Sequence, residues 1–367
     1  MTNAVNLAQA GNSNSSLGFK NRIINGAMVI DQRNAGAAVT INAAAVTYTL
    51  DRWRAFGVAS AGVYTVQQNS GSVTPPAGYS NYLGIKTTTA DASVAAGSLY
   101  FLGQFIEGFN FSDLAFGTAN AKTLTISFWV YSSLTGTFGG SLSNSAYNRS
   151  YPFTYTVSSA NTWQQISITI AGDTTGTWVG GTNGIGVSVN FDLGSGSSNL
   201  STAGAWAGAG YIGATGDTKI IGTLNAVWYI TGVQLEVGST ATQFDYRDYG
   251  RELIMCQRYY AKLGGTGASG YMAIGSGIGR SGTLYSGYIK FPVTMRTAPT
   301  LAISGAMAMM YSGDNWVNIS TIASTYGGYD STLFQGAVAS SVLSAGMALV
   351  ITQNADSAAF IAMASEL

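Results

Sequence analysis

Thr123-Leu-Thr-Ile-Ser-Phe-Trp-Val-Tyr131 alternates polar and apolar residues along its whole length. The same alternation recurs in Asn161–Ile170 and in Ile185–Phe191. Successive side chains of a β-strand point to opposite faces, so this period of two gives each strand one apolar face. Clusters of Gly, Asn and Ser separate such segments, as in short antiparallel strands joined by turns. The sequence therefore predicts an all-β protein, with a jelly-roll-like β-sandwich over residues 19–247.

The composition excludes several classes of function. The 367 residues include 16 Lys+Arg and 16 Asp+Glu, so the formal net charge is zero and only 9% of residues are charged. A protein that neutralises nucleic-acid phosphates needs a basic surplus, so we expect no nucleic-acid partner. The chain has no histidine, which excludes Ser-His-Asp and Cys-His catalysis and His-ligated zinc. The single cysteine, Cys256, excludes an intrachain disulfide, and we expect it to be a buried apolar residue.

Neither a membrane span nor a cofactor site is predicted. Residues 1–10 lack the basic start and apolar core of a secretory signal. The most apolar run, Gly336–Ile351, is interrupted by serines and short for a membrane span, so we expect two core strands and no membrane insertion. Gly277–Gly282 matches GxGxxG, but strand-like sequence follows it where a nucleotide site needs a helix. No D-x-[DN]-x-[DN]-G loop occurs, and we expect no metal and no cofactor.

The regions outside the sandwich are distinct in composition. Residues 1–18 form a polar leader, which we interpret as an attachment arm held by another subunit. Residues 248–263 combine a capping aspartate, apolar residues at three-four-three spacing and a following Gly-Gly, which predicts a helical linker. From residue 264 to 367 the β-pattern returns, which predicts a smaller C-terminal β-domain. The helix could pack against the sandwich, or three copies could assemble around an axis. The apolar residues of that assembly face are Leu253, Cys256, Tyr260 and Leu263.

Two segments far apart in the chain carry a family resemblance. The first reads FKNRIINGAMVIDQR at 19–33, followed by YTLDRWR at 48–54. The second reads WYITGVQLEV at 228–237, followed by FDYR at 244–247. We expect both to be strand segments that open and close one sandwich. An NRIINGAM…DQR…LDRW opening with a GVQLEVG…YR close resembles the tail-fibre and receptor-binding proteins of tailed bacteriophages, and the resemblance covers roughly residues 19 to 260.

This resemblance implies a function in the virion. The chain would be a subunit of a homotrimeric tail fibre that attaches to a host surface glycan or protein without enzymatic activity. Residues 1–18 would bind other virion proteins, and residues 264–367 would form the receptor-binding tip. One alternative is a structural virion component, such as a capsid decoration, head fibre or collar protein, with no host contact. A polysaccharide depolymerase is a third possibility.

Paired carboxylates are the candidates for such a depolymerase, since two acids can hydrolyse a glycan without histidine. Asp31 and Asp51 lie in the opening motif among arginines, which favours ion pairs that fix the end of the sandwich. Asp245, Asp248 and Glu252 form a second group. We predict no catalytic residue among them.

Aromatic residues are the strongest ligand-side feature of the sequence. Sugars stack their C–H faces on flat rings while small polar groups meet the hydroxyls, and tyrosine supplies contact area at small entropic cost. Burial in the sandwich or at a subunit interface is the competing interpretation for each loop tryptophan. We expect three further tryptophans to be core residues: Trp129, Trp163 and Trp228. Two more tyrosines of the C-terminal domain are expected to be exposed, Tyr285 and Tyr288. The predicted ligand-binding residues are Trp178, Trp206, Tyr211, Tyr271, Trp316, Tyr326 and Tyr329.

Overall fold

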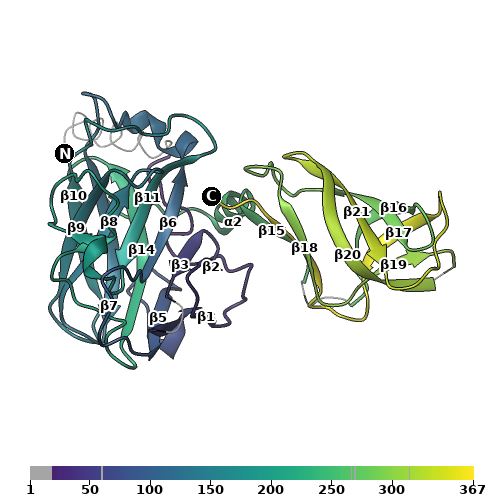
Figure 1. Ribbon diagram of the computed structural model, residues 1–367, viewed down its shortest axis with the longest axis horizontal. Helices are drawn as coiled ribbons and strands as arrows, with labels where there is room; N and C mark the ends of the chain where they lie inside the picture. The colour runs from purple at the N-terminus through teal and green to yellow at the C-terminus, as the bar shows by residue number, and fades with distance from the viewer. Residues whose placement is uncertain (1–18, 59–60, 266, 268–269, 314) are drawn as a thin grey trace, which may run out of the picture. The chain divides into compact units, whose positions relative to one another are not determined.

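The computed structural model describes residues 19–367 except 59–60, 266, 268–269 and 314. The predicted attachment arm, residues 1–18, lies outside the described residues. The chain divides into two compact units: the first extends to Tyr249 and includes Leu367, and the second is Gly250–Glu366. Strands dominate both units (Figure 1), which confirms the all-β prediction.

The first unit is a sandwich of two six-stranded sheets whose strands pair antiparallel, as the jelly-roll-like prediction requires. One sheet has the order β1 (Val39–Ile41), β4 (Val63–Gln68), β5 (Leu83–Thr89), β14 (Val227–Val237), β7 (Leu124–Ser132), β10 (Gln164–Ile170). The other has the order β2 (Val46–Leu50), β3 (Trp53–Phe56), β6 (Phe101–Glu107), β11 (Ile185–Asp192), β8 (Gly136–Ser143), β9 (Ser150–Val157). The short strands β12 (Leu200–Ser201) and β13 (Gly213–Ala214) form a parallel pair.

The alternation along β7 sets the core of this sandwich. Leu124, Ile126 and Phe128 are buried in the core cluster, whereas Trp129 on the opposite face is only half-buried. Trp163, directly before β10, is also half-buried. The expectation of three core tryptophans is therefore wrong for Trp129 and Trp163, because neither occupies an inward position of the alternation. The third, Trp228, is fully buried, as expected.

The closing strand β14 contains a glycine that the fold requires. The register with β7 shifts between Thr231 and Gln234, and Gly232 in this interval has φ of 61°. A Cβ atom built on Gly232 would lie 2.6 Å from the ring of Tyr79. Only glycine tolerates both the left-handed backbone and this close contact. Gly232, the first glycine of the GVQLEVG motif, therefore permits the register shift in β14.

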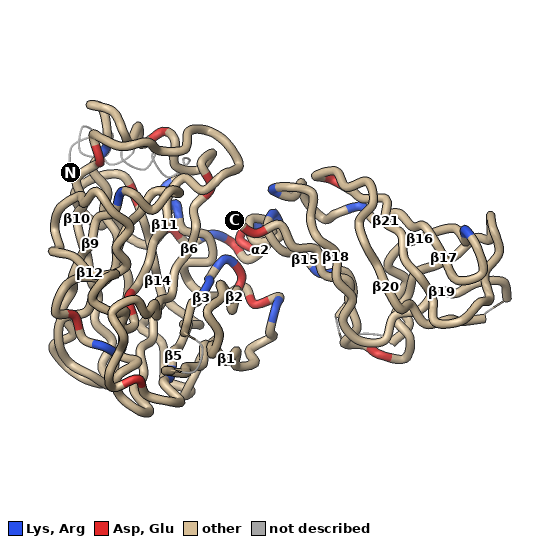
Figure 2. Tube along the Cα trace, in the orientation of Figure 1, with Lys and Arg blue, Asp and Glu red and all other residues tan. Residues whose placement is uncertain are grey.

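The second unit contains a closed six-stranded sheet and a separate three-stranded sheet. The closed sheet has the order β16 (Ala273–Gly279), β17 (Leu284–Lys290), β21 (Ser331–Val338), β20 (Asn315–Gly327), β19 (Met307–Tyr311), β22 (Ala348–Gln353). The three-stranded sheet has the order β15 (Tyr260–Gly264), β23 (Phe360–Ala364), β18 (Thr300–Ser304). Charged positions are sparse along these strands (Figure 2).

The apolar run Gly336–Ile351 forms the end of β21 and the start of β22, as predicted. Among the described residues, none of the helices has the length and apolarity to cross a membrane. The GxGxxG match at Gly277–Gly282 spans the end of β16 and the turn that leads to the strand β17. That turn lacks the helix that a phosphate-binding loop needs.

The predicted helix at 248–263 is too long. Helix α2 covers Tyr249–Gln257, and Tyr260 begins strand β15. Tyr260 and Leu263 pair with Ala364 and Ile361 of β23, so they do not share a helical face with Leu253 and Cys256. Backbone pairing with a strand distant in sequence overrides the local helical spacing here. Cys256 is buried, as expected, but the four residues form no single assembly face.

Candidate functional site

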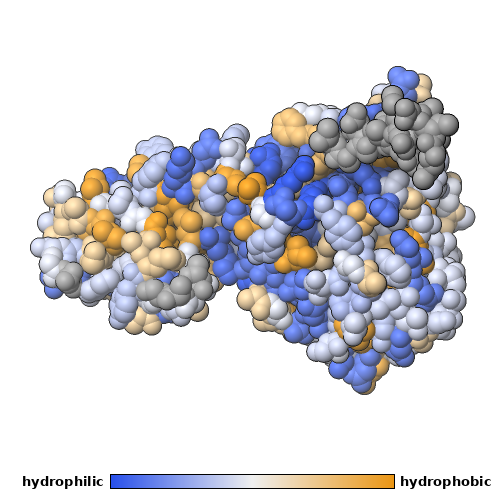
Figure 3. Space-filling model, turned by 180° about the vertical axis from the view of Figure 1, so that it is seen from behind, coloured by the Kyte–Doolittle hydropathy of each residue, from blue (hydrophilic) through white to orange (hydrophobic). Residues whose placement is uncertain are grey.

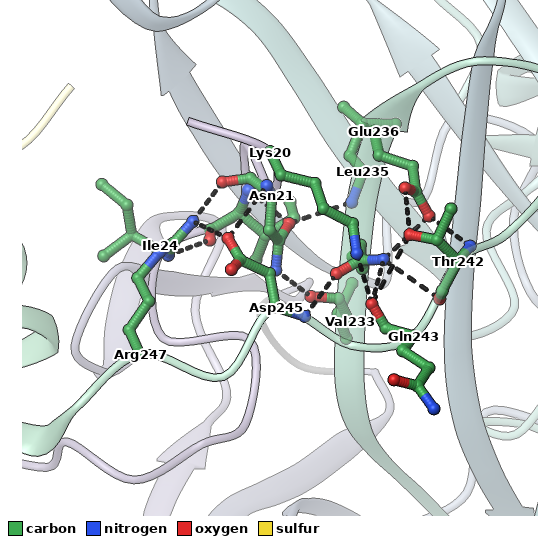
Figure 4. Close-up of polar contacts among 12 residues, drawn as sticks. Lys20, Asn21, Ile24, Val233, Leu235, Glu236, Thr242, Gln243, Asp245 and Arg247 are labelled. Atoms are coloured by element: carbon green, nitrogen blue, oxygen red, sulfur yellow. Dashed lines mark hydrogen bonds and ion pairs between the residues drawn. The ribbon is translucent and has the colours of Figure 1, made fainter. Parts of the chain in front are cut away.

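The opening and closing motifs are joined by a buried network in the first unit (Figure 4). The side chain of Asn21 donates from Nδ2 to the carbonyl of Val233 (3.0 Å) and accepts at Oδ1 from the N–H of Leu235 (3.1 Å). Arg247 donates from its guanidinium to the carbonyl of Ile23 (3.0 Å) and lies 3.5 Å from Asp245. These contacts hold the two ends of the sandwich chain together, so the residues of both motifs have structural roles.

Carboxylates of the two motifs hold backbone in place. Asp31 accepts the N–H of Asn34 (2.9 Å), and Asp51 accepts the N–H of Gln32 (2.6 Å). Asp245 accepts the N–H of Asn21 (3.3 Å). The remaining two predicted acids belong to the helix region: Asp248 precedes α2, and Glu252 is buried within it. The three carboxylates therefore have structural roles, but they bind backbone N–H groups, whereas ion pairs with arginines were expected for Asp31 and Asp51.

A buried carboxyl pair that the sequence did not reveal lies at the end of β11. Asp192 ends that strand, and Asp217 follows β13 in a turn; both are buried. A Cβ atom on Gly213 would lie 2.7 Å from Asp217 Oδ2 and 2.8 Å from Asp192 Cβ, so the backbone passes close to both acids. Burial, followed by the negative charge of Asp192 and a hydrogen bond with it, raises the pKa of Asp217 to about 8. The pair therefore holds a proton at neutral pH, inside the protein.

The two predicted loop tryptophans of the first unit belong to one aromatic cluster. The ring centroids of Trp178 and Trp206 are 5.5 Å apart, and Phe116 lies 4.9 Å from Trp178 and 5.7 Å from Trp206. The indole N–H of Trp178 donates to Asp173 (3.3 Å), and that of Trp206 donates to the carbonyl of Ala171 (2.8 Å). Both rings pack half-buried against the core. Because their faces and N–H groups already have partners, the competing interpretation of burial in the sandwich applies to both.

An open groove of about 510 Å³ crosses the outer face of the closed sheet in the second unit. Two exposed tyrosines line it, Tyr288 on β17 and Tyr326 on β20, with exposed fractions of 51% and 72%. Leu333 on β21 pairs with both of them, so the three side chains form a row across neighbouring strands. Adjacent strands are about 4.8 Å apart, which places the two tyrosine backbones about 10 Å from each other. Figure 3 shows apolar side chains interspersed with polar ones on this unit.

Four polar side chains line the same groove: Ser276, Arg280, Ser286 and Gln335. Ser286 is buried at the floor and lies beside Gln335 in the register of β17 and β21. Within the described part of the chain, none of the four side chains makes a hydrogen bond or ion pair. Donors and acceptors without internal partners, placed beside flat rings, can bind a polar ligand that also has apolar faces.

The other predicted residues lie outside this groove. Tyr271 and Trp316 contact each other, with centroids 5.6 Å apart, and Trp316 is on strand β20 although a loop was expected. Tyr329 is exposed in the turn after β20. Tyr211, in the first unit, is half-buried and donates its backbone N–H to Ser150 (3.0 Å).

The prediction that Tyr285 is exposed is wrong. Its side chain is fully buried, and its hydroxyl donates to the carbonyl of Thr321 (2.8 Å). Tyr285 and Tyr288 are three residues apart on one strand, so they must point to opposite faces. The alternation could have identified Tyr285 as the buried one of the two, because it shares the inward face with the apolar residues Ile289 and Phe291.

Sequence reasoning missed most of the groove. The alternation marks outward positions on each strand, but it does not show which strands become neighbours. The missed lining residues are Ser276, Gly277, Ile278, Arg280, Ser286, Gly287, Leu333 and Gln335.

Comparison with known proteins finds likeness only in structure. No protein-family model and no curated protein sequence matches the chain. The enzymatically active domain of tailspike protein 4 from bacteriophage CBA120 is 11% identical, with a TM-score of 0.30, over 59% of this chain and 21% of that chain. A CBM4 structure is 18% identical, with a TM-score of 0.28, over 58% of this chain and 98% of that chain. The family 11 carbohydrate-binding module of Clostridium thermocellum is 11% identical, with a TM-score of 0.28, over 54% of this chain and 96% of that chain. The function is therefore inferred from the groove itself.

Proposed function

We propose that this chain is a fibre subunit of a tailed-phage virion that binds a host surface glycan in the groove of its second unit. The observation that carries the proposal is the pair of exposed rings, Tyr288 and Tyr326, beside polar side chains without internal partners. Successive sugar units of a glycan can each offer a C–H face to one tyrosine, and their hydroxyls can bond to Ser276, Ser286 and Gln335. The location in a virion is proposed from the resemblance of the opening and closing motifs.

The groove favours binding over hydrolysis. Glycoside hydrolysis requires two carboxyl groups on either side of the scissile bond. The ten residues that line the groove include neither Asp nor Glu. This composition supports an adhesive role without catalysis.

Several copies would make weak contacts effective. One or two ring contacts at an exposed site contribute about 1 kcal/mol each, which corresponds to low affinity for a single groove. Linked copies convert later contacts into intramolecular events and raise the overall affinity by about 10²-fold or more. We propose a homotrimer, so sedimentation of the purified protein should give the mass of three 38.0 kDa chains.

The groove is tested with the full chain on an array of bacterial surface glycans. Tyr288→Ala and Tyr326→Ala should each weaken binding about fivefold, since each removes one stacking surface. Tyr329→Ala is the matched control, because Tyr329 is equally exposed but lies outside the groove. Circular dichroism of each variant verifies that the fold is retained. Unchanged binding by both groove variants would refute the proposal.

The virion role has a separate test. The purified protein should bind susceptible cells and block adsorption of the parent phage. Binding to capsids or tails alone, with no effect on adsorption, would contradict the adhesive role and favour a structural component.

A further inference from the structure

One cation lines the groove and has no counter-charge there. We infer that the groove selects an anionic sugar, one that carries a carboxylate or a phosphate, through Arg280. This inference rests on the proposed function and adds the class of ligand to it.

Arg280 is held at the groove by its backbone. It follows β16 directly, and its N–H donates to the carbonyl of Leu284 (2.8 Å), which closes the turn to β17. The side chain is exposed and lines the groove with Ile278 and Ser286. The backbone is therefore fixed, while the guanidinium remains accessible to a ligand.

The charge of Arg280 is uncompensated within the described chain. Arg22 pairs with Asp113 (2.8 Å), and Arg149 pairs with Asp173 (2.7 Å). Arg280 has no such partner among the described residues, and no acid lines the groove. Few other charged residues lie along the strands of this unit (Figure 2), so little negative charge offsets the positive charge of Arg280.

The guanidinium matches an anionic sugar in geometry as well as in charge. Its planar fork can donate two parallel hydrogen bonds to a carboxylate or phosphate, which a hydroxyl group cannot accept in the same way. Exposed ion pairs contribute about 1 kcal/mol or less, and Arg280 is exposed at the groove. We therefore expect a preference for the charged sugar of about twofold to fivefold at low salt.

Matched pairs of glycans test the inference. One pair is oligogalacturonate and its carboxyl-reduced form; the other is phosphomannan and its dephosphorylated form. The full chain should bind at least one charged glycan more tightly than its neutral twin, and the pair that responds identifies the anion. This preference should decline as NaCl rises from about 50 mM to about 500 mM, because salt screens an exposed pair.

Variants assign the preference to Arg280. Arg280→Gln should abolish it, so that the charged and the neutral glycan bind equally, while Arg280→Lys should retain part of it. Lys290→Gln is the control, since Lys290 is an exposed cation at the other end of β17 and does not line the groove. Equal binding of both twins by the wild type, or a preference that persists in Arg280→Gln, overturns the inference while the tyrosine-dependent binding stands. If the wild type binds none of the four glycans and Tyr288→Ala changes nothing on the wider array, both proposals fail.

Discussion

Tyr288 and Tyr326 stand on either side of Leu333 in one row across three neighbouring strands of the closed sheet. The sequence predicted that Tyr288 is exposed and that Tyr326 binds a ligand, but it did not predict that the two lie in one groove. The strand register selects them, because β21 lies between β17 and β20. The groove is therefore a property of strand pairing.

The stability of the closed sheet should depend on a glycine at position 287, Gly287. A Cβ atom at this position would lie 2.3 Å from the ring of the buried Phe334, so Gly287→Ala overpacks the interior. We expect a loss of about 1–3 kcal/mol in the free energy of unfolding, measured by chemical denaturation. Gly287→Ala/Phe334→Leu should lose less than the sum of the two single variants, because the shorter side chain relieves the clash. Additive losses would show that the predicted contact is absent.

The link between the two motifs should be a major contribution to the stability of the sandwich. Asn21→Ala leaves the buried N–H of Leu235 and the carbonyl of Val233 without their side-chain partner. The expected loss is at least about 2 kcal/mol in the free energy of unfolding. Asn120→Ala, at an exposed turn, should change it by less than about 0.5 kcal/mol. Equal stability of the two variants would contradict a structural role for the motif.

The tryptophan cluster should affect stability without affecting glycan binding. Trp178→Ala removes a ring that packs on Phe116 and Trp206, so the sandwich should lose about 2 kcal/mol or more. Binding on the glycan array should remain within twofold of the wild type, since the groove belongs to the other unit. A variant that is stable but has lost binding would instead place the ligand at this cluster.

The carboxyl pair should make stability dependent on pH. An aspartate in the unfolded chain loses its proton near pH 4, whereas Asp217 in the folded protein keeps it until about pH 8. Between these values the folded state binds the extra proton, so the contribution of Asp217 to stability decreases as pH rises from about 4 toward 8. The slope is on the order of 1 kcal/mol per pH unit.

Asp217→Asn removes this titration and should flatten the dependence of the melting temperature on pH between about 5 and 8. It should also stabilise the protein at alkaline pH relative to the wild type. Asp113→Asn, at a more exposed carboxylate, is the control for the change in net charge. A wild-type slope that survives in Asp217→Asn would show that other groups cause it.

The class of fold follows from local patterns in the amino-acid sequence. The period of two along Thr123–Tyr131 is a local property of the strand, and its apolar residues Leu124, Ile126 and Phe128 are all buried in the core. The absence of histidine likewise limited the chemistry through composition alone.

The ends of the strands and the contacts between side chains depend on tertiary structure. Pairing with β23 turned Tyr260–Gly264 into a strand although its spacing favoured a helix. The two predicted loop tryptophans, Trp178 and Trp206, contact each other in a cluster, while Tyr288 and Tyr326 line one groove. The physical reason is that side-chain direction follows from the local backbone, whereas neighbours across strands depend on contacts between residues distant in sequence.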